Sequence, residues 1–318
     1  GVAEIAELET SAVMAPPPVL PLFESISDRL AHVHTDTPFD EFGRQPLKPF
    51  DLSQTGPGLT WADLNGDGWD DLLISTGQGG TLGVFTNDAR GGFSAFSNPA
   101  LLKPAPRDLT TVMVLRGVIL SGISNGEDGV TNGGAIRIVD LTSGVSGEIL
   151  SGRACPVGSM AAADVDGDGS LEVFVGGRSV AGRYPEAAPS MLLRNQGGRL
   201  TPVTRWDDLG LVTAACFTDL DGDGRPDLVL AREWAPPRFF RNESGRLTEW
   251  APVLEGASGS FSGLWNAVVA GDFDEDGRLD LVLGDWGRNT RWSASGTAPR
   301  RLWYGDFGSG QGLDLAER

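Results

Sequence analysis

The sequence predicts an all-β fold assembled from repeated units of four short strands. Its 318 residues include 45 glycines and 20 prolines, a proportion typical of chains with many tight turns. A phrase rich in aspartate and glycine recurs along the chain, and a short apolar run follows it each time. No amphipathic run of about ten residues or more separates these segments, so a parallel sheet with helical crossovers is not expected.

Four acidic segments of the same length align without gaps and mark the repeats. They begin at Asp63, Asp164, Asp219 and Asp272. Most of the spacing fits a period of about 50 residues, the length of one four-stranded propeller blade, but the first interval is about twice as long. We therefore expect a repeat without an acidic loop near residues 108–122, where two apolar segments flank Arg116 and Gly117.

The rest of each period supplies further strands. A second phrase follows each loop and consists of an apolar segment, a turn with Asn or Gly, and another segment, as in residues 238–247. Apolar runs such as 228–231 do not alternate with polar residues, which predicts strands buried on both faces. The predicted fold is a β-propeller over residues 22–318, with about six to seven four-stranded blades and acidic loops between the first two strands of several blades. The last repeat is incomplete at Arg318.

The composition of the acidic segments predicts calcium sites. Carboxylates at positions one, three and five converge on a hard cation, and glycine at position six lets the backbone turn sharply. An acid at position nine and the peptide carbonyl of position seven complete the set. The predicted ligands, about four calcium ions in all, are Asp63, Asn65, Asp67, Trp69 and Asp71; Asp164, Asp166, Asp168, Ser170 and Glu172; Asp219, Asp221, Asp223, Arg225 and Asp227; and Asp272, Asp274, Asp276, Arg278 and Asp280.

The pattern differs from an EF-hand, because the last acid stands at position nine rather than twelve and a β-run follows at once. It resembles the FG-GAP/VCBS repeat of integrin α-subunit propellers and of many secreted bacterial proteins. Residues 34–42, 52–58 and 284–295 are similar to a bacterial subgroup that carries an ASPIC/UnbV-like region. The resemblance covers roughly residues 22–315, and it implies a calcium-binding propeller with a role in adhesion or assembly.

One further segment departs from the pattern. Residues 306–314 stand where such proteins often have another full acidic loop, but Gly308 and Gly310 replace two ligands. We expect no calcium there.

The N-terminal segment predicts a separate element. Residues 1–21 end in a proline-rich stretch, which favours an extended arm that does not fold alone. We expect this arm to lie as a strap on another protein subunit. The sequence begins at Gly1 without the features of an export signal, so that any such signal has been removed or was never included.

Charge and cysteine content limit the partners and the location. A net charge of −18 opposes binding to nucleic acid, and no apolar run is long enough for a membrane span. We expect an extracellular or periplasmic protein. Cys155 and Cys216 are compatible with a disulfide in an oxidising compartment, although two small buried side chains fit them better.

No catalytic constellation is evident, and we expect a non-catalytic interaction or structural subunit. His32 and His34 are the two histidines, and packing explains them more simply than acid–base chemistry. The alternative is a carbohydrate-active enzyme or a glycan-binding adhesin that uses the propeller as scaffold. Tryptophan and arginine residues near the C-terminal end suit either blade packing or a partner-binding face; they are Trp286, Trp292, Trp303, Arg288, Arg291, Arg300 and Arg301.

Overall fold

A computed structural model describes the chain over residues 25, 29–53, 56–129, 134–150, 156–252, 261–287, 290, 294, 298–308 and 313–317. The chain divides into two units, residues 1–31 and 32–318, and the fold described below is that of the second. The expected arm at residues 1–21 lies outside the described part, and so does Cys155. No described helix is long and apolar enough to cross a membrane.

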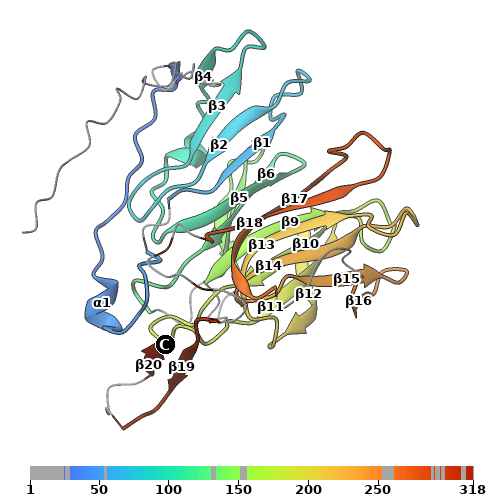
Figure 1. Cartoon of the computed structure of the whole chain (residues 1–318). Coiled ribbons are helices and arrows are strands. Elements are labelled where there is room, and N and C mark those ends of the chain that lie inside the picture. The colour runs from blue at the N-terminus through green and yellow to red at the C-terminus, as the bar shows by residue number, and fades with distance from the viewer. Residues whose placement is uncertain are drawn as a thin grey trace, which may run out of the picture. The chain divides into compact units, whose positions relative to one another are not determined.

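Four antiparallel four-stranded sheets follow one another along the chain (Figure 1), and within each the strand order is the chain order. The first sheet holds β1 (Leu59–Ala62), β2 (Asp71–Ile74), β3 (Gly83–Asn87) and β4 (Phe93–Ala95). The second holds β5 (Leu109–Leu115), β6 (Val118–Ile123), β7 (Ile136–Asp140) and β8 (Ser146–Ile149). The third holds β9 (Val157–Ala163), β10 (Glu172–Gly177), β11 (Ser190–Gln196) and β12 (Arg199–Trp206), and the fourth β13 (Leu211–Thr218), β14 (Asp227–Ala235), β15 (Arg238–Asn242) and β16 (Leu247–Trp250).

Two hairpins follow the four sheets. The first pairs β17 (Gly263–Gly271) with β18 (Asp280–Asp285), and the end of β14 also pairs with β17. The second pairs β19 (Leu302–Gly305) with β20 (Asp314–Glu317). Two short helices, α1 (Glu41–Arg44) and the 3-10 helix η2 (Pro99–Leu102), complete the described elements.

The propeller-like arrangement of four-stranded sheets is confirmed, but the expected six to seven blades are not. The described residues form four complete sheets. The two later repeats keep their first two strands as hairpins. Apart from the end of β14, which joins β17 to the fourth sheet, no further strand pairs with them in the described part of the chain. The number of acidic loops gives the number of hairpins formed by the first two strands of each repeat. A complete blade also needs a third and a fourth strand that find hydrogen-bonding partners, so the sequence overestimated the number of blades.

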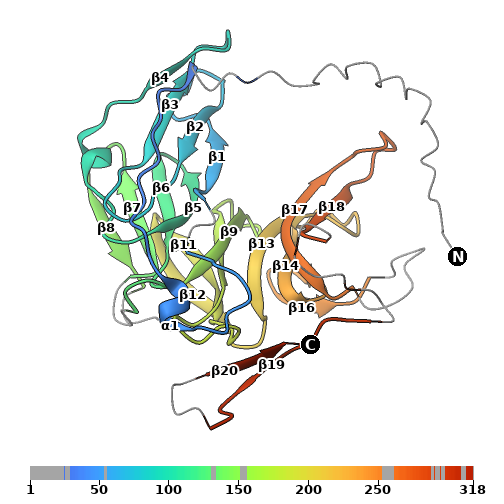
Figure 2. The same ribbon diagram turned by 60° about the vertical axis from the view of Figure 1, so that its left-hand side comes forward.

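The sheets are held together by apolar layers between neighbours, and in Figure 2 their first strands lie side by side toward the inside. One buried cluster joins the first and second sheets through Leu73 and Ile119, and another joins the second and third through Ile136 and Val173. A third joins the third and fourth sheets around Phe174. The second and third sheets therefore have an apolar layer on both faces, which explains why their second strands are apolar without alternation.

The repeat without an acidic loop is confirmed. Strands β5 and β6 are joined by Arg116 and Gly117 alone, with φ of 48° and 81°. Two central residues with positive φ form the tight turn whose twist matches a two-stranded ribbon. This repeat keeps its strands and has no room for a cation-binding loop.

Candidate functional site

The four acidic loops share one hydrogen-bonded frame. In each, the carboxylate at position one accepts a bond of 2.8–2.9 Å from the backbone N–H of the glycine at position six. Those glycines are Gly68, Gly169, Gly224 and Gly277, with φ between 82° and 87°. Few other residues adopt this conformation readily, so the recurring glycine is explained by the turn it makes.

The position-seven residues complete this frame through their backbone. The N–H groups of Trp69, Ser170, Arg225 and Arg278 each donate to the position-five carboxylate of their own loop, at 2.7–2.9 Å. Two of their side chains add an ion pair to the same acid, Arg225 to Asp223 and Arg278 to Asp276. Each loop is therefore curled around its acidic side chains.

The acid at position nine anchors the loop to its sheet. Asp71, Glu172 and Asp227 are almost wholly buried, at 0%, 2% and 0% exposure, and each accepts a 3.0 Å bond from the N–H of position two. Asp71 and Asp227 also accept from the N–H of Asn87 and Asn242 at the end of the third strand. Burial raises the pKa of Glu172 and of Asp227, so a nearby cation would favour their ionised forms.

Three loops bring carboxylate oxygens close enough to share one ion. One oxygen from each acid lies within 4.8 Å of the others in three trios, which are Asp164, Asp166 and Glu172; Asp219, Asp221 and Asp227; and Asp272, Asp274 and Asp276. Calcium–oxygen bonds of about 2.4 Å place ligands on opposite sides of the ion at nearly this separation. The donor set therefore suits calcium.

The second acidic loop gives independent evidence that its side chains suit a cation. Oδ1 of Asp164 and Oε1 of Glu172 are buried, and neither has a hydrogen-bond partner within the described residues. A buried carboxylate oxygen without a partner is costly, and a cation between the two would offset that cost.

The first and fourth loops differ from the middle two. No trio of acids forms in the first, where the amide of Asn65 donates to Asp67. In the fourth, Asp280 is only half-buried and takes no part in the trio. Its hairpin has no third strand in the described residues to cover it, unlike the sheet that covers Asp227.

Two arginines beside the loops were not predicted from sequence. Arg194 on β11 and Arg241 on β15 each lie 2.8 Å from the position-three carboxylate, Asp166 and Asp221 respectively. They occupy the same place in consecutive repeats, immediately before an asparagine. The recurrence of an Arg-Asn pair at this place in both repeats was the feature of the sequence from which these arginines could have been predicted.

The segment 306–314 keeps the frame without the ligands. The N–H of Phe307 donates to Asp314 at 2.8 Å, as position two donates to position nine in the four loops. Gly308 stands at the third position, and Gly310 lies outside the described residues. Its two strands pair as the other first hairpins do.

The other candidate residues have structural partners. The ring of His32 packs edge-on against Phe85 at 5.9 Å, and burial lowers its pKa. Trp286 packs against Phe50 at 5.0 Å, and Trp303 is 43% exposed. Arg300 and Arg301 are exposed, and the other members of the expected cluster, Arg288, Arg291 and Trp292, lie outside the described residues.

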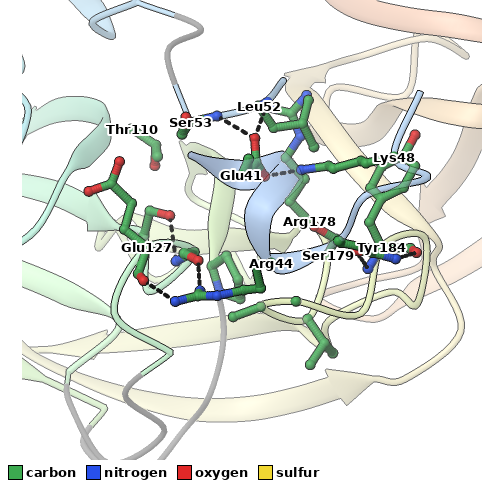
Figure 3. Close-up of a pocket in the computed structure, with 18 of the residues that line it drawn as sticks. Glu41, Arg44, Lys48, Leu52, Ser53, Thr110, Glu127, Arg178, Ser179 and Tyr184 are labelled. Carbon is green, nitrogen blue, oxygen red and sulfur yellow. Dashed lines mark hydrogen bonds and ion pairs between the residues drawn. The ribbon is translucent and has the colours of Figure 1, made fainter. Parts of the chain in front are cut away.

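A cavity lies at the opposite end of the sheets from the acidic loops. Its wall is formed by α1, by the starts of first strands at Thr110 and Val157, and by residues that follow second strands, such as Glu127 and Ser179 (Figure 3). The acidic loops instead join the ends of first strands to the starts of second strands. Glu41, Leu52 and Ser53 lie in segments that the sequence analysis compared with a bacterial subgroup, but the sequence did not predict a cavity, because its walls come from distant segments.

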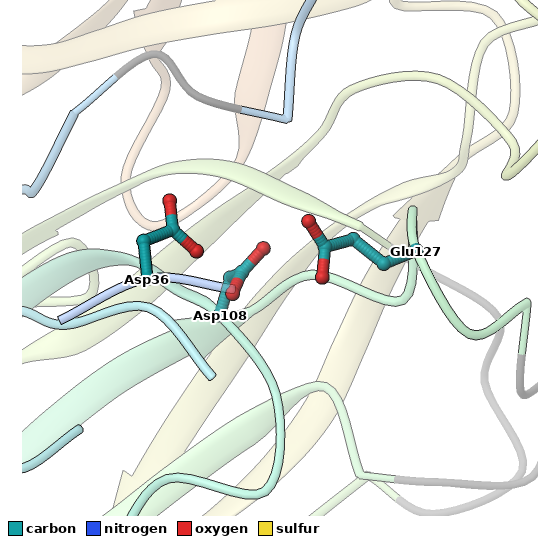
Figure 4. Close-up of side chains that lie close together, drawn as sticks. All are labelled: Asp36, Asp108 and Glu127. Atoms are coloured by element: carbon teal, nitrogen blue, oxygen red, sulfur yellow. The ribbon is translucent and has the colours of Figure 1, made fainter. Parts of the chain in front are cut away.

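Beside this cavity, three carboxylates face one another (Figure 4). Asp36, Asp108 and Glu127 bring one oxygen each within 4.8 Å of the others. Burial and the neighbouring acids raise the pKa of Glu127 to about 7, and burial raises the pKa of Asp108. Part of this group is therefore protonated near neutral pH.

The comparisons with known proteins agree with this class of repeat protein. Residues 219–283, which include the third and fourth acidic loops, match the family described as FG-GAP-like repeat. The sequence resemblance to FG-GAP-repeat β-propellers is thereby confirmed. No curated protein matches the sequence significantly.

One similar solved structure is the extracellular domain of a protein named as a hybrid two-component system of B. thetaiotaomicron. It is 12% identical, with a TM-score of 0.43, over 76% of this chain and 27% of that one.

Proposed function

We propose that this chain is a calcium-binding, non-catalytic β-propeller module that serves outside the cytoplasm as an interaction or structural subunit. The observation that carries the proposal is the convergence of carboxylate oxygens in the acidic loops, together with the unpartnered buried oxygens of Asp164 and Glu172. Acidic turns that serve only to end strands would have no reason to bury carboxylate oxygens without hydrogen-bond partners.

The ligands in this proposal are the side chains at positions one, three, five and nine and the carbonyl at position seven. Bound calcium would neutralise the converging charges of each loop. The position-nine acid begins the second strand, and Asp71 and Asp227 also accept a bond from the third strand, so the ion would tie the loop to the sheet behind it. About four ions are expected, and the two middle loops, which have the most buried acids, should hold theirs most tightly.

The location outside the cytoplasm follows from the expected affinity. Extracellular calcium modules bind with dissociation constants of about 10⁻⁴–10⁻³ M, so their sites fill only where calcium is plentiful.

An assembly role is supported by apolar side chains exposed on the hairpin β17–β18. Val269 and its cross-strand partner Val282 are 52% and 51% exposed. Val229, which holds the place of Val282 in the fourth sheet, is wholly buried. An apolar pair of this kind suits a protein partner, and the arm at residues 1–21 would supply a second contact as a strap.

Calcium content tests the proposal most directly. The protein would be stripped with EGTA, equilibrated with 1 mM calcium and measured by isothermal titration and elemental analysis. About four bound ions per chain are expected, and magnesium should not replace them. A protein that binds fewer than one ion per chain would end the calcium proposal.

The partner is tested separately, by cross-linking and mass spectrometry of the native protein in the presence of calcium. A Val282→Asp variant should lose the captured protein while its calcium content stays unchanged. Capture that is unaffected by this variant would remove β17–β18 from the proposed interface.

A further inference from the structure

The cavity beneath α1 is enclosed mainly by charged and hydroxyl-bearing side chains (Figure 3). Its cover is fastened at two points. The side chain of Gln45 donates to the carbonyl of Tyr184 at 2.6 Å and accepts from its N–H at 3.0 Å. Arg44 donates to the carbonyls of Gly126 and Glu127. The space beneath this cover is about 100 Å³.

Lys48 is the central cation of the cavity. Its side chain is only 4% exposed, and its ammonium group forms an ion pair with Glu41 and lies 5.2 Å from the centre of the Tyr184 ring. Within the described residues, Glu41 is its one hydrogen-bond acceptor. An ammonium group has three donors, so two of them have no hydrogen-bond acceptor among the described residues.

Two arginines add unused capacity to bind an anion. Arg178 pairs with Glu233, but its Nε is buried and has no hydrogen-bond partner among the described residues. Arg44 contacts two backbone carbonyls and has no carboxylate partner in the described part of the chain. Two of the three cations are thus paired with an acid. The third, Arg44, forms no ion pair among the described residues, and the acid of the cavity wall that opposes its charge is Glu127, whose pKa is raised to about 7.

The charges around Lys48 also favour a bound anion. Burial lowers the pKa of Lys48, and the like charge of Arg178 lowers it further, against the opposing effects of Glu41 and, more weakly, of Asp51. Glu41 has little capacity left to balance them, since its second oxygen already accepts bonds from the N–H groups of Leu52 and Ser53. An anion in the cavity would relieve the repulsion between the two cations.

We propose that this cavity is a binding site for a small organic carboxylate, held by the spare donors of Lys48 and Arg178. The hydroxyl groups of Ser53 and Ser179, which also line the space, would contact the rest of the molecule. A space of this size holds several water molecules or a small organic carboxylate. The site is independent of the acidic loops, which lie at the other end of the sheets.

The test uses the two lysines of the chain, Lys48 and Lys103. Protein labelled with ¹³C at the lysine ε-carbon gives one NMR signal for each, and a Lys103→Arg variant identifies which is which. Acetate would be titrated to 50 mM at constant ionic strength and saturating calcium. The signal of Lys48 should shift saturably, while that of the exposed Lys103 stays in place.

Acetamide is the matched control because it has the shape of acetate without the charge. It should leave Lys48 unshifted, and a Lys48→Gln variant should bind acetate at least tenfold more weakly by calorimetry. An Arg178→Lys variant, which keeps the charge and loses the Nε donor, should weaken acetate about threefold to tenfold. Absence of a saturable shift at Lys48 in the unaltered protein, or an equal shift with acetamide, would overturn the proposal, since neither result depends on how the variants fold.

Discussion

The backbone N–H of Asn242 donates a 2.8 Å hydrogen bond to Oδ1 of Asp227, the ninth residue of the third acidic loop. Both residues are wholly buried. The amide nitrogen of Asn242 also donates to the carbonyl of Val165, which belongs to the second acidic loop in the neighbouring sheet. One asparagine thus connects two candidate calcium loops, and its own oxygen accepts from Gly245.

Replacement of Asn242 by alanine should therefore destabilise the protein whether or not calcium is present. The change removes three side-chain hydrogen bonds, to the carbonyls of Val165 and Pro226 and from the N–H of Gly245, and leaves the carbonyl of Val165 without its donor, at a cost of about 2–3 kcal/mol. Urea denaturation in calcium and in EGTA would measure it. Asn195→Ala is the matched control, because that asparagine is half-buried and has one intraloop bond, from Gly198. Equal losses in the two variants would show that the contact with Val165 contributes little.

Loss of a single ligand should affect one site. Asp221→Ala removes a position-three carboxylate and should lower calcium content by one ion per chain. If the dissociation constant is about 0.1 mM, stability in 1 mM calcium falls by about 1.4 kcal/mol. In EGTA the difference from the unaltered protein should shrink. Asp306→Ala serves as control, because segment 306–314 has Gly308 where a ligand would stand. Equal calcium loss from both variants would contradict the distinction between the two kinds of loop.

Removal of all calcium should lower the melting temperature. Four sites of this affinity contribute roughly 5–6 kcal/mol in 1 mM calcium, which is comparable to the whole stability of many domains. Scanning calorimetry before and after EGTA would measure the change, and calcium but not magnesium should restore it, since magnesium demands a smaller, octahedral site. A melting curve that EGTA does not move would count against bound calcium.

The fourth loop contains a backbone strain at Glu275 that a substitution can remove. Position four is glycine in the other three loops but Glu275 here, with φ of 62°. A left-handed backbone costs a non-glycine residue about 1 kcal/mol, so Glu275→Gly should stabilise the protein by about 0.5–1 kcal/mol. Gly222→Ala at the same position of the third loop, where φ is 76°, should destabilise it by a similar amount. Chemical denaturation in excess calcium would compare them, and a loss of stability in Glu275→Gly would contradict this account.

The carboxylate group beside the cavity should make stability depend on pH. The pKa of Glu127 is raised to about 7 from the ordinary 4.5, so between these values the folded protein holds a proton that the unfolded chain has released. Stability from this source is present below pH 4.5, falls as the pH rises to 7, and is constant above it. Glu127→Gln removes this titration, and its stability relative to the unaltered protein should therefore increase from pH 5 to pH 8. Urea denaturation at both values with calcium held constant measures the difference. An unchanged difference would show that neither burial nor the neighbouring acids raise the pKa of Glu127 in the folded protein.

The acidic loops were predictable from sequence because their geometry is local. Positions one to nine lie within one turn of the chain, so that the spacing of Asp219, Asp221 and Gly224 already determines which groups converge. The same holds for the turn at Arg116 and Gly117, because two residues are too few to form a cation-binding loop. Apolar runs without alternation were enough to indicate strands buried on both faces.

The number of complete sheets depended on tertiary pairing. The hairpin β17–β18 has the loop and strand pattern of its predecessors, yet Val282 is exposed where Val229 is buried. Whether a strand is covered depends on hydrogen-bonding partners from elsewhere in the chain. The sequence of residues 280–285 alone does not predict those partners.

The cavity is the clearest case of what only the tertiary structure decided. Lys48, Glu127 and Arg178 lie far apart in the sequence, and none stands in a motif. They meet because the segment with α1 crosses the ends of the second and third sheets opposite the acidic loops. Sequence determines a site whose ligands share one turn of chain, whereas a site built from three separated segments exists only after the sheets have packed, since packing alone places its charges within reach of one another.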